Sequence, residues 1–469
     1  MDATGNGGHM PDGYPGKRFL TATGIAAARP EPWLTNGQPI VPARFRMERT
    51  GQWHALQSMG RRFAIGCVAL EITQRCNLDC TLCYLSDSSE AVHDLPLVEV
   101  YRRIDLIRNH YGPDTDVQVT GGDPTLRRRD ELLAIVRRVR ERGMRPSLFT
   151  NGIRATRELL AQLCGAGLED VAFHVDLTRQ RKGYATEAAL NAVRAAYIER
   201  ARGLPLSVMF NTTVFDGNHD QIPDIAAFFV ANADVVRLAS FQLQAQTGRG
   251  TAAAGQVSVT VDSVSDRLRQ GAGAPIALGL PVGHSGCNRY GLTLVVNKRV
   301  YDLYDDDTIL SYLFAATAAA RFDRRRPSRA VLALTRALLA KPRVILRSFH
   351  WAARKLWAMR GDLWASRGRA HKLSFFIHDF MDAGSLECAR IDACVFMAAT
   401  RDDPISMCLH NAKRDTFILA PVATGHGWWD PLTGTASPAR GPGISGPRGV
   451  KTLKGRARAD MIRAQGASS

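Results

Sequence analysis

The sequence predicts an α/β fold in which parallel strands alternate with helices and form a barrel or part of one. Six short apolar runs rich in β-branched residues lie between residues 65 and 243, and helix-like stretches separate them. This alternation is typical of repeated β/α units. Such barrels carry their chemistry in loops at the carboxyl ends of the strands, so functional residues are expected directly after the apolar runs.

The predicted elements follow from the spacing of apolar residues. Amphipathic stretches predict helices at Leu97–His110 and Arg129–Arg142, and the second ends at Gly143. The side chains expected on the core face of this second helix are Leu132, Leu133, Val136 and Val139. The six predicted strands are Ile65–Thr73, Val117–Thr120, Ser147–Thr150, Val171–Asp176, Leu206–Thr213 and Val235–Leu243.

Changes in composition divide the chain into segments. We expect a loosely structured lead-in (1–60), the barrel (61–250), an accessory region with Cys287 (251–320), a basic amphipathic helical segment (321–371), a cysteine-containing C-terminal domain (372–425) and a disordered basic tail (426–469).

The basic character of the chain belongs mostly to one segment. The 469 residues include 61 Lys and Arg against 44 Asp and Glu, a formal net charge of +17. Between Arg321 and Lys372 there are 15 basic and 2 acidic residues, a net of +13.

Neither a secretory signal nor a membrane-spanning segment is expected, because no apolar run is suitable. Nine cysteines in such a chain indicate thiolate chemistry or metal ligation in a cytoplasmic protein.

Three cysteines follow the first predicted strand in the segment CNLDCTLC. Cys76, Cys80 and Cys83 have the spacing C-x3-C-x2-C, which can hold three irons of a cubane and leave the fourth iron open. A structural zinc site would need a second knuckle, and no C-x2-C or H-x3-H partner stands nearby. A redox dithiol would leave the third cysteine unexplained. The motif therefore indicates a [4Fe–4S] cluster with one iron free to bind a ligand.

A second motif ends the second predicted strand, where Gly121, Gly122, Asp123 and Pro124 follow Thr120. Together with the three cysteines it resembles the radical S-adenosylmethionine (SAM) superfamily, whose GGEP segment contacts the methionyl ammonium of SAM. The resemblance implies a partial (β/α)6 radical SAM barrel with a C-terminal cysteine-containing accessory domain. It also implies that the cluster cleaves SAM to a 5′-deoxyadenosyl radical, with electrons from a reductant protein of the flavodoxin or ferredoxin type.

The sequence departs from the family pattern at two positions. Asp123 is one methylene shorter than the usual Glu, so backbone oxygens are expected to share the contact with the ammonium. Leu82 stands where an aromatic residue often precedes the third cysteine, and Tyr84 follows it as a candidate for packing against adenine. Three further polar residues at strand ends, Asn151, Asp176 and Asn211, are candidates for SAM binding. The alternative is that they are ordinary turn residues or half-buried polar groups.

The six remaining cysteines fall into two groups. Cys67 and Cys164 lie in an apolar strand and an apolar helix and are expected to be small buried residues. The others lie beyond the barrel, and either they ligate an auxiliary iron–sulfur cluster or they are buried thiols. The candidates for ligation are Cys287, Cys394 and Cys408, with Cys388 as the fourth.

Residues Arg343–Leu363 predict an amphipathic helix flanked by tryptophans. Its predicted apolar stripe is Ile345, Phe349, Ala352, Leu356, Met359 and Leu363. Three interpretations remain open: docking on an anionic membrane surface, RNA binding, or packing on the barrel with a solvated basic face. As a partner, the membrane ranks above nucleic acid because no RNA-binding module is recognisable. Membrane docking would place the protein at the inner membrane face.

The elements IHDFMDA and MCLHNA, within residues 372–425, are similar to the C-terminal region of tetraether lipid synthases of the radical SAM superfamily. That likeness implies radical C–H activation on a lipid or isoprenoid substrate. Two alternatives remain. One is a peptide or cofactor maturase with an auxiliary iron–sulfur cluster, and the other is a non-enzymatic iron–sulfur or zinc-binding scaffold.

Overall fold

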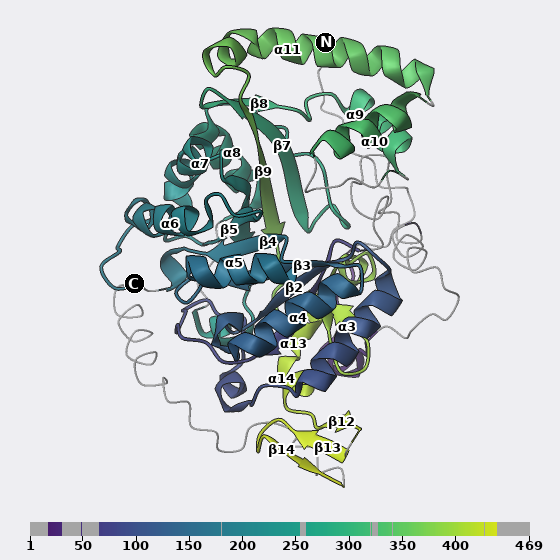
Figure 1. Ribbon diagram of the computed structural model, residues 1–469. Coiled ribbons are helices and arrows are strands. Elements are labelled where there is room, and N and C mark those ends of the chain that lie inside the picture. Colours follow the sequence, from purple (N-terminus) through teal and green to yellow (C-terminus); the bar gives the residue numbers. More distant parts are fainter. Residues whose placement is uncertain are drawn as a thin grey trace.

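The computed structural model describes residues 17–30, 48, 65–179, 181–253, 259–318, 320, 327–339, 341–425 and 427–438. Its centre is an 11-stranded sheet with the strand order β11-β10-β1-β2-β3-β4-β5-β6-β9-β7-β8. A three-stranded sheet, β12-β13-β14, lies at one end of the molecule, and the long helix α11 lies at the opposite end (Figure 1).

The strands are β1 (Cys67–Thr73), β2 (Asp116–Gly121), β3 (Arg145–Thr150), β4 (Asp170–His174), β5 (Ser207–Val214), β6 (Val236–Leu243), β7 (Asn288–Val296), β8 (Arg299–Asp302), β9 (Ala370–Asp379), β10 (Phe396–Ala399), β11 (Pro404–Ser406), β12 (Val422–Thr424), β13 (Gly427–Asp430) and β14 (Thr435–Ser437).

The α-helices are α1 (Ala22–Ala27), α3 (Leu97–Tyr111), α4 (Arg129–Glu141), α5 (Arg157–Ala166), α6 (Glu187–Ala201), α7 (Ile222–Ala231), α8 (Val261–Ala272), α9 (Asp307–Thr317), α10 (Pro327–Leu339), α11 (Pro342–Ala365), α12 (Cys388–Asp392), α13 (Met407–Ala412) and α14 (Arg414–Ile418). Short 3-10 helices are η1 (Asp87–Ala91), η2 (Pro124–Leu126), η3 (Leu177–Arg179), η4 (His219–Gln221) and η5 (Gly248–Ala253).

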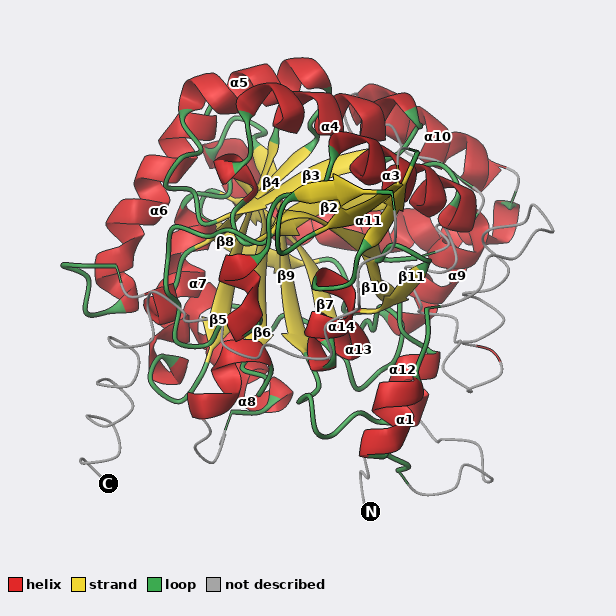
Figure 2. Ribbon diagram, turned by 90° about the horizontal axis from the view of Figure 1, so that it is seen from below, coloured by secondary structure: helices red, strands yellow, loops and turns green. Residues whose placement is uncertain are grey.

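The first six strands form the predicted parallel β/α arrangement. Each of β1 to β6 pairs in parallel with the next strand in sequence. The six predicted strands are confirmed, with ends within two residues of those expected. Figure 2 shows the strands inside a curved layer of helices. Because all six strands run the same way, their carboxyl ends and the loops that follow them lie at one end of the barrel.

The sheet is wider than the six predicted strands because later segments add to both of its edges. β9 pairs in parallel with β6 and antiparallel with β7, which forms a hairpin with β8. On the other edge, β10 pairs in parallel with β1 and antiparallel with β11. An open strand edge leaves backbone groups unpaired, and these additions satisfy them. The segments expected to form an accessory region and a C-terminal domain therefore contribute strands to the same sheet as the barrel.

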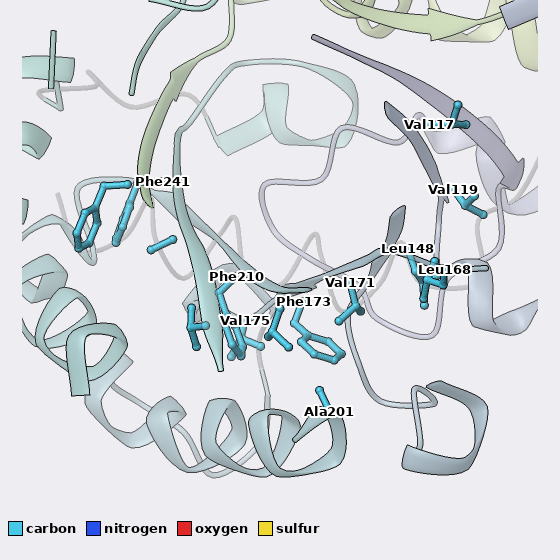
Figure 3. Close-up of a cluster of buried hydrophobic side chains, with 14 of the residues drawn as sticks. Val117, Val119, Leu148, Leu168, Val171, Phe173, Val175, Ala201, Phe210 and Phe241 are labelled. Atoms are coloured by element: carbon cyan, nitrogen blue, oxygen red, sulfur yellow. The ribbon is translucent and has the colours of Figure 1, made fainter. Parts of the chain in front are cut away.

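The core lies between the strands and the helices that cover them. Phe173 and Phe210, on neighbouring strands, have their ring centroids 5.6 Å apart and are fully buried. Figure 3 shows these rings on the side of the sheet that faces a helix. Burying one such side chain contributes about 1.5–3 kcal/mol. On α4 the buried positions are Leu132, Ile135, Val136 and Val139, whereas Leu133, expected on the core face, is only partly buried.

Both ends of the described chain are more ordered than the sequence predicts. In the expected lead-in, the backbone N–H of Leu20 donates to the carbonyl of Leu386 (2.8 Å) just before α1. The predicted start of the disordered tail at residue 426 is wrong, because β13 and β14 pair with β12 and place Trp429 opposite Val422. Residues 439–469 of that predicted tail lie outside the described residues.

The basic segment contains α10 and α11. The helix predicted at Arg343–Leu363 corresponds to α11, with ends within two residues of those expected. Among the residues that the structure describes, no helix has both the length and the apolar character needed to span a membrane.

Candidate functional site

The three motif cysteines lie in the loop between β1 and η1, at the carboxyl end of the barrel. Cys80 and Cys83 are buried, and Cys76 is partly buried beside Leu78. Burial raises the pKa of the Cys80 thiol to about 11 and also raises that of Cys76. Burial thus favours the neutral thiols. Binding of a metal would instead favour the thiolates, since thiols coordinate metals in their deprotonated form.

Two arginines, the buried Arg249 and the half-buried Arg179, reach these thiols from distant loops. Arg179, in η3 after β4, lies 3.2 Å from the sulfur of Cys80 through its Nη1. Arg249, in η5 after β6, lies 3.5 Å from the sulfur of Cys83 through its Nη2. Burial opposes the charge on each guanidinium, but the neighbouring thiolates and carboxylates together raise its pKa. The loop therefore combines three sulfurs with two fixed positive charges.

The two glycines of the second motif bring the loop after β2 against the loop after β1. The backbone N–H of Gly122 donates to the carbonyl of Thr73 (2.9 Å), and that of Asp123 donates to the carbonyl of Arg75 (2.8 Å). A Cβ on Gly121 would lie 1.9 Å from the Thr73 oxygen, and one on Gly122 would lie 2.0 Å from the Arg75 oxygen. Gly121 also has a φ of +124°, which L-residues rarely adopt. Glycine at both positions thus permits the close approach of the two loops.

Asp123 organises this end of the barrel from within. The carboxylate is fully buried, and one oxygen accepts from the backbone N–H and the hydroxyl of Thr125 (3.0 and 2.5 Å). Its other oxygen accepts from the hydroxyl of Thr150 and the backbone N–H of Asn151 (both 2.8 Å). These contacts tie β2 to the end of β3. Asp123 also caps η2, which starts at Pro124. The side chain of Asp123 therefore stabilises the conformation of the glycine loop.

Tyr84 faces the C-terminal segment as well as the glycine loop. Its hydroxyl donates to the carbonyl of Gly121 (2.5 Å), and the guanidinium carbon of Arg414 lies 4.7 Å from its ring centroid. The ring is thus stacked on Arg414. The sequence predicts that this ring could pack against adenine. Such packing would have to use the face of the ring that Arg414 does not cover.

Arg414 also forms a buried ion pair with Glu71 on β1. Its Nη1 lies 2.7 Å from both carboxylate oxygens, and Gln74 donates to one of them (2.8 Å). Burial alone would raise the pKa of Glu71, but Arg414 and the hydrogen bonds lower it to about 2. Burial lowers the pKa of the neighbouring His410 to about 4. The pair joins α14 to the strand that precedes the cysteine loop.

The polar residues predicted at the other strand ends lie in the same network. Asn151 places its Nδ2 4.0 Å from the sulfur of Cys76, and Asp176 accepts from the backbone N–H of Thr213 (3.0 Å). Asn211 contacts His174 (2.9 Å), and the other ring nitrogen of His174 contacts Arg179 (2.8 Å). Asn211 therefore reaches the cysteine loop through His174 and Arg179.

The donor set fits an iron–sulfur cluster. Three thiolates add negative charge to a cluster, and Arg179 and Arg249 are placed to offset it. In the described part of the chain, no three His, Cys, Asp or Glu side chains converge as ligands of a single metal ion. A cubane distributes its cysteine ligands over separate irons.

A second group of thiols lies near the starts of β7 and β10, where Cys287 precedes β7, Cys394 precedes β10 and Cys408 lies on α13. Burial, with a smaller contribution from Cys394, raises the pKa of Cys287 to about 11 although Arg390 opposes the shift. Burial also raises the pKa of Cys408, with further contributions from Cys394 and Cys287. The guanidinium of Arg390 lies 3.3 Å from the sulfur of Cys287. Three of the four predicted auxiliary ligands are therefore close enough to interact electrostatically. Cys388 begins α12, where its backbone N–H donates to the carbonyl of Arg18 (2.8 Å).

Comparison with known families identifies the barrel. Residues 70–229 match the radical SAM superfamily. They form a radical SAM domain. Its first strand, cysteine loop and glycine loop are those of the site described above, and the match continues into α7.

Relatives of the radical SAM domain differ in what their names say they act on. The chain is 28% identical over 187 residues to a 7,8-dihydro-6-hydroxymethylpterin dimethyltransferase of Methanocaldococcus jannaschii, with 38% of this chain and 36% of the relative covered. It is 28% identical over 224 residues to a PqqA peptide cyclase of Xanthomonas euvesicatoria, with 43% and 56% covered. The chain thus spans between about a third and just over half of these relatives.

A solved structure of Streptococcus suis SuiB bound to its precursor peptide SuiA also aligns with the chain. The TM-score is 0.29 at 16% identity, and the alignment covers 43% of this chain and 42% of that one.

The sequence did not indicate the charged residues around the cysteines. Arg249 lies in a Gly- and Ala-rich stretch at the predicted end of the barrel segment, 61–250. The structure packs this loop on the site, where the N–H of Gly250 donates to the carbonyl of Cys83 (3.0 Å). Arginine between two glycines was the available signal, since such a loop can approach another backbone closely.

Proposed function

We propose that this protein is a radical SAM enzyme that activates a C–H bond of its substrate. The observation that carries the proposal is the loop of Cys76, Cys80 and Cys83, which is hydrogen-bonded to the glycine loop at the carboxyl ends of the first two strands of the radical SAM domain. When bound, a [4Fe–4S] cluster supplies the electron that cleaves SAM and generates the 5′-deoxyadenosyl radical. A flavodoxin- or ferredoxin-type protein is the proposed electron donor.

The chain's own residues hold and orient the reactants. Arg179 and Arg249 offset the negative charge at the thiolates, and either guanidinium also suits a carboxylate such as that of SAM. Gly121 and Gly122 present backbone groups near the cysteine loop. Asp123 fixes their position through its hydrogen bonds to Thr150 and Asn151 at the end of β3. The role of Tyr84 is to hold the carbonyl of Gly121 in place.

The substrate class favoured by the relatives is a peptide or a small heterocyclic cofactor precursor. Two relatives carry names that specify a pterin and a peptide. A lipid or isoprenoid substrate is the second candidate. The likeness of residues 372–425 to tetraether lipid synthases favours it.

An auxiliary cluster ligated by Cys287, Cys394 and Cys408 is also proposed. Two observations support it, in the same combination of thiols and guanidinium as at the core cysteines. The three thiols, of which Cys408 is half-buried, influence one another electrostatically, and Arg390 lies beside Cys287. With Cys388 as the fourth ligand, the site would be closed, and without it one iron would remain open.

The decisive experiment replaces Cys76, Cys80 and Cys83 together by Ala. Anaerobic reconstitution of the unaltered protein should load about four irons at the core site. The triple variant should produce no 5′-deoxyadenosine from SAM under reducing conditions, whereas Cys164→Ala, a half-buried thiol on α5, should keep the activity. Undiminished cleavage by a correctly folded triple variant would refute the proposal.

The same triple variant tests the auxiliary cluster. It should retain iron and sulfide, and further replacement of Cys287, Cys394 and Cys408 should remove them. Complete loss of iron from the first variant, with circular dichroism unchanged, would exclude the auxiliary site. Candidate substrates labelled with deuterium then distinguish peptide, cofactor precursor and lipid by which of them transfers label into 5′-deoxyadenosine.

A further inference from the structure

Helix α11 packs on the rest of the protein through one face only. Met359 is buried on that face. Lys355 forms an ion pair with Asp305 (2.7 Å), and Asp362 accepts from Asn297 (2.9 Å) and from Tyr301. These contacts fasten the helix to the β7–β8 hairpin and to the loop before α9. The single acidic residue of α11 is thereby turned inward.

The opposite face of α11 carries large apolar side chains in solvent. The exposed fractions are 75% for Leu346, 71% for Phe349, 68% for Trp357 and 89% for Trp364. Their spacing of 3, 8 and 7 residues places them along one side of the helix. The apolar stripe predicted from the sequence is therefore only partly buried. Met359 packs against the protein, whereas Phe349 is exposed to solvent. α10 adds Val331 and Leu339, which are 63% and 66% exposed.

Basic side chains border this apolar face. From residue 327 to residue 372 the chain has 11 Lys and Arg and one acidic residue, Asp362. Arg360 lies over the ring of Trp357, with its guanidinium carbon 4.0 Å from the ring centroid. Arg336 on α10, Arg347 on α11 and Lys341 between the two helices are also exposed. The surface thus combines tryptophans with cations, which suits the boundary between lipid headgroups and acyl chains.

We propose that the exposed face of α10 and α11 is a docking surface for an anionic lipid bilayer. Leu346, Phe349, Trp357 and Trp364 enter the headgroup boundary, and the surrounding arginines and lysines contact lipid phosphates. Charge complementarity selects this occupant. A second copy would bring two strongly basic faces together, and their repulsion opposes pairing of this face with itself.

The docking surface lies at the end of the barrel opposite the cysteines. α11 ends at Ala365 and β9 begins at Ala370, so the helix lies where this strand starts. β9 runs parallel to β6, and the cysteine loop follows the carboxyl end of the parallel strand β1. Docking through α11 therefore leaves the catalytic end uncovered. The inference is independent of the proposed catalytic function and of the substrate.

Sedimentation of the full chain with vesicles tests the proposal. Vesicles containing phosphatidylglycerol should bind the protein at low salt, and vesicles of phosphatidylcholine alone should bind it far more weakly. Replacing Trp357 and Trp364 by Ala should lower the vesicle partition coefficient by roughly tenfold or more. The double variant Arg336→Glu/Arg347→Glu should lower it similarly at low salt and less at high salt, where charges are screened.

Two matched variants control for general effects of apolarity and charge. Val98→Ala/Ile153→Ala removes exposed apolar side chains elsewhere, and Arg137→Glu/Arg267→Glu makes the same charge change on α4 and α8. Both should bind vesicles as the unaltered protein does. Absence of binding at low salt, equal binding to uncharged vesicles, or equal losses in the control variants would overturn the proposal. So would a dimer in solution that Trp357→Ala/Trp364→Ala dissociates, since a second copy would then be the occupant.

Discussion

The carboxyl end of the barrel and the α10–α11 surface use arginine in opposite ways. At the barrel end, Arg249 and Arg414 are buried and the side chain of Arg179 is only 17% exposed, and each contacts a thiol or a carboxylate. On α11, Arg347 and Arg360 are exposed, and both lie over aromatic rings. A buried guanidinium without its partner is strongly destabilising, whereas an exposed one is solvated whether or not it is paired.

This difference indicates where each region's arrangement is determined. The barrel end is fixed by its own internal contacts, so its geometry exists before any ligand arrives. The α10–α11 surface leaves its apolar side chains exposed to solvent. Their main contribution is therefore to the free energy of binding a partner that buries them. Substitutions at the first region should therefore alter stability, and substitutions at the second should alter association.

The largest effect is expected at the buried ion pair. Glu71→Gln leaves the charge of Arg414 buried without its counterion, which should lower the free energy of unfolding by about 3–5 kcal/mol. Urea denaturation measures this loss. Arg128→Ala, which breaks an exposed pair with Asp130, is the matched control and should leave the urea midpoint unchanged. An equal loss in both variants would remove the contrast between buried and exposed arginines.

The same pair predicts an acid dependence of stability. The pKa of Glu71 is lowered from 4.5 to about 2 in the folded chain, so ionised Glu71 stabilises the protein above pH 4.5. That contribution, about 3 kcal/mol, should be lost as the pH falls from 4.5 toward 2. Unfolding free energies measured across this range should fall less steeply for Glu71→Gln. Identical slopes for the two proteins would show that Glu71 is not the group responsible.

The glycine loop should show an intermediate effect. Gly121→Ala would place a Cβ 1.9 Å from the oxygen of Thr73 at a φ of +124°, and such strain costs about 1–3 kcal/mol. SAM affinity, measured by calorimetry on the reconstituted enzyme, should fall as the loop shifts. Gly165→Ala on α5 meets no atom within 4 Å and should instead stabilise the helix by about 0.5–1 kcal/mol. A neutral Gly121→Ala would mean that the two loops are not packed as described.

The smallest stability effect is expected on the surface. Trp364→Ser, at a side chain 89% exposed, should change the free energy of unfolding by no more than about 0.5 kcal/mol. Chemical denaturation provides the measurement. A large destabilisation would indicate that the fold depends on contacts made by Trp364 on the exposed face of α11, and would contradict the difference drawn between the two regions.

The sequence alone determined the parts of this protein that local patterns encode. Alternating apolar runs located β1 to β6, since the side-chain periods of strands and helices are properties of neighbouring residues. The spacing of Cys76, Cys80 and Cys83 placed three thiols in one loop because all three lie within eight residues. The helical period likewise located α11.

Tertiary structure decided which distant residues complete the site and which face of a helix remains exposed. Arg179 reaches Cys80 across 99 residues, Arg249 reaches Cys83 across 166, and Arg414 reaches Glu71 across 343. No local spacing encodes such contacts, because they arise only when segments far apart in the sequence meet in the folded chain. The predicted stripe on α11 is only partly buried for a related reason. Periodicity identifies the apolar positions of a helix, but only the packed neighbours decide which of them are buried.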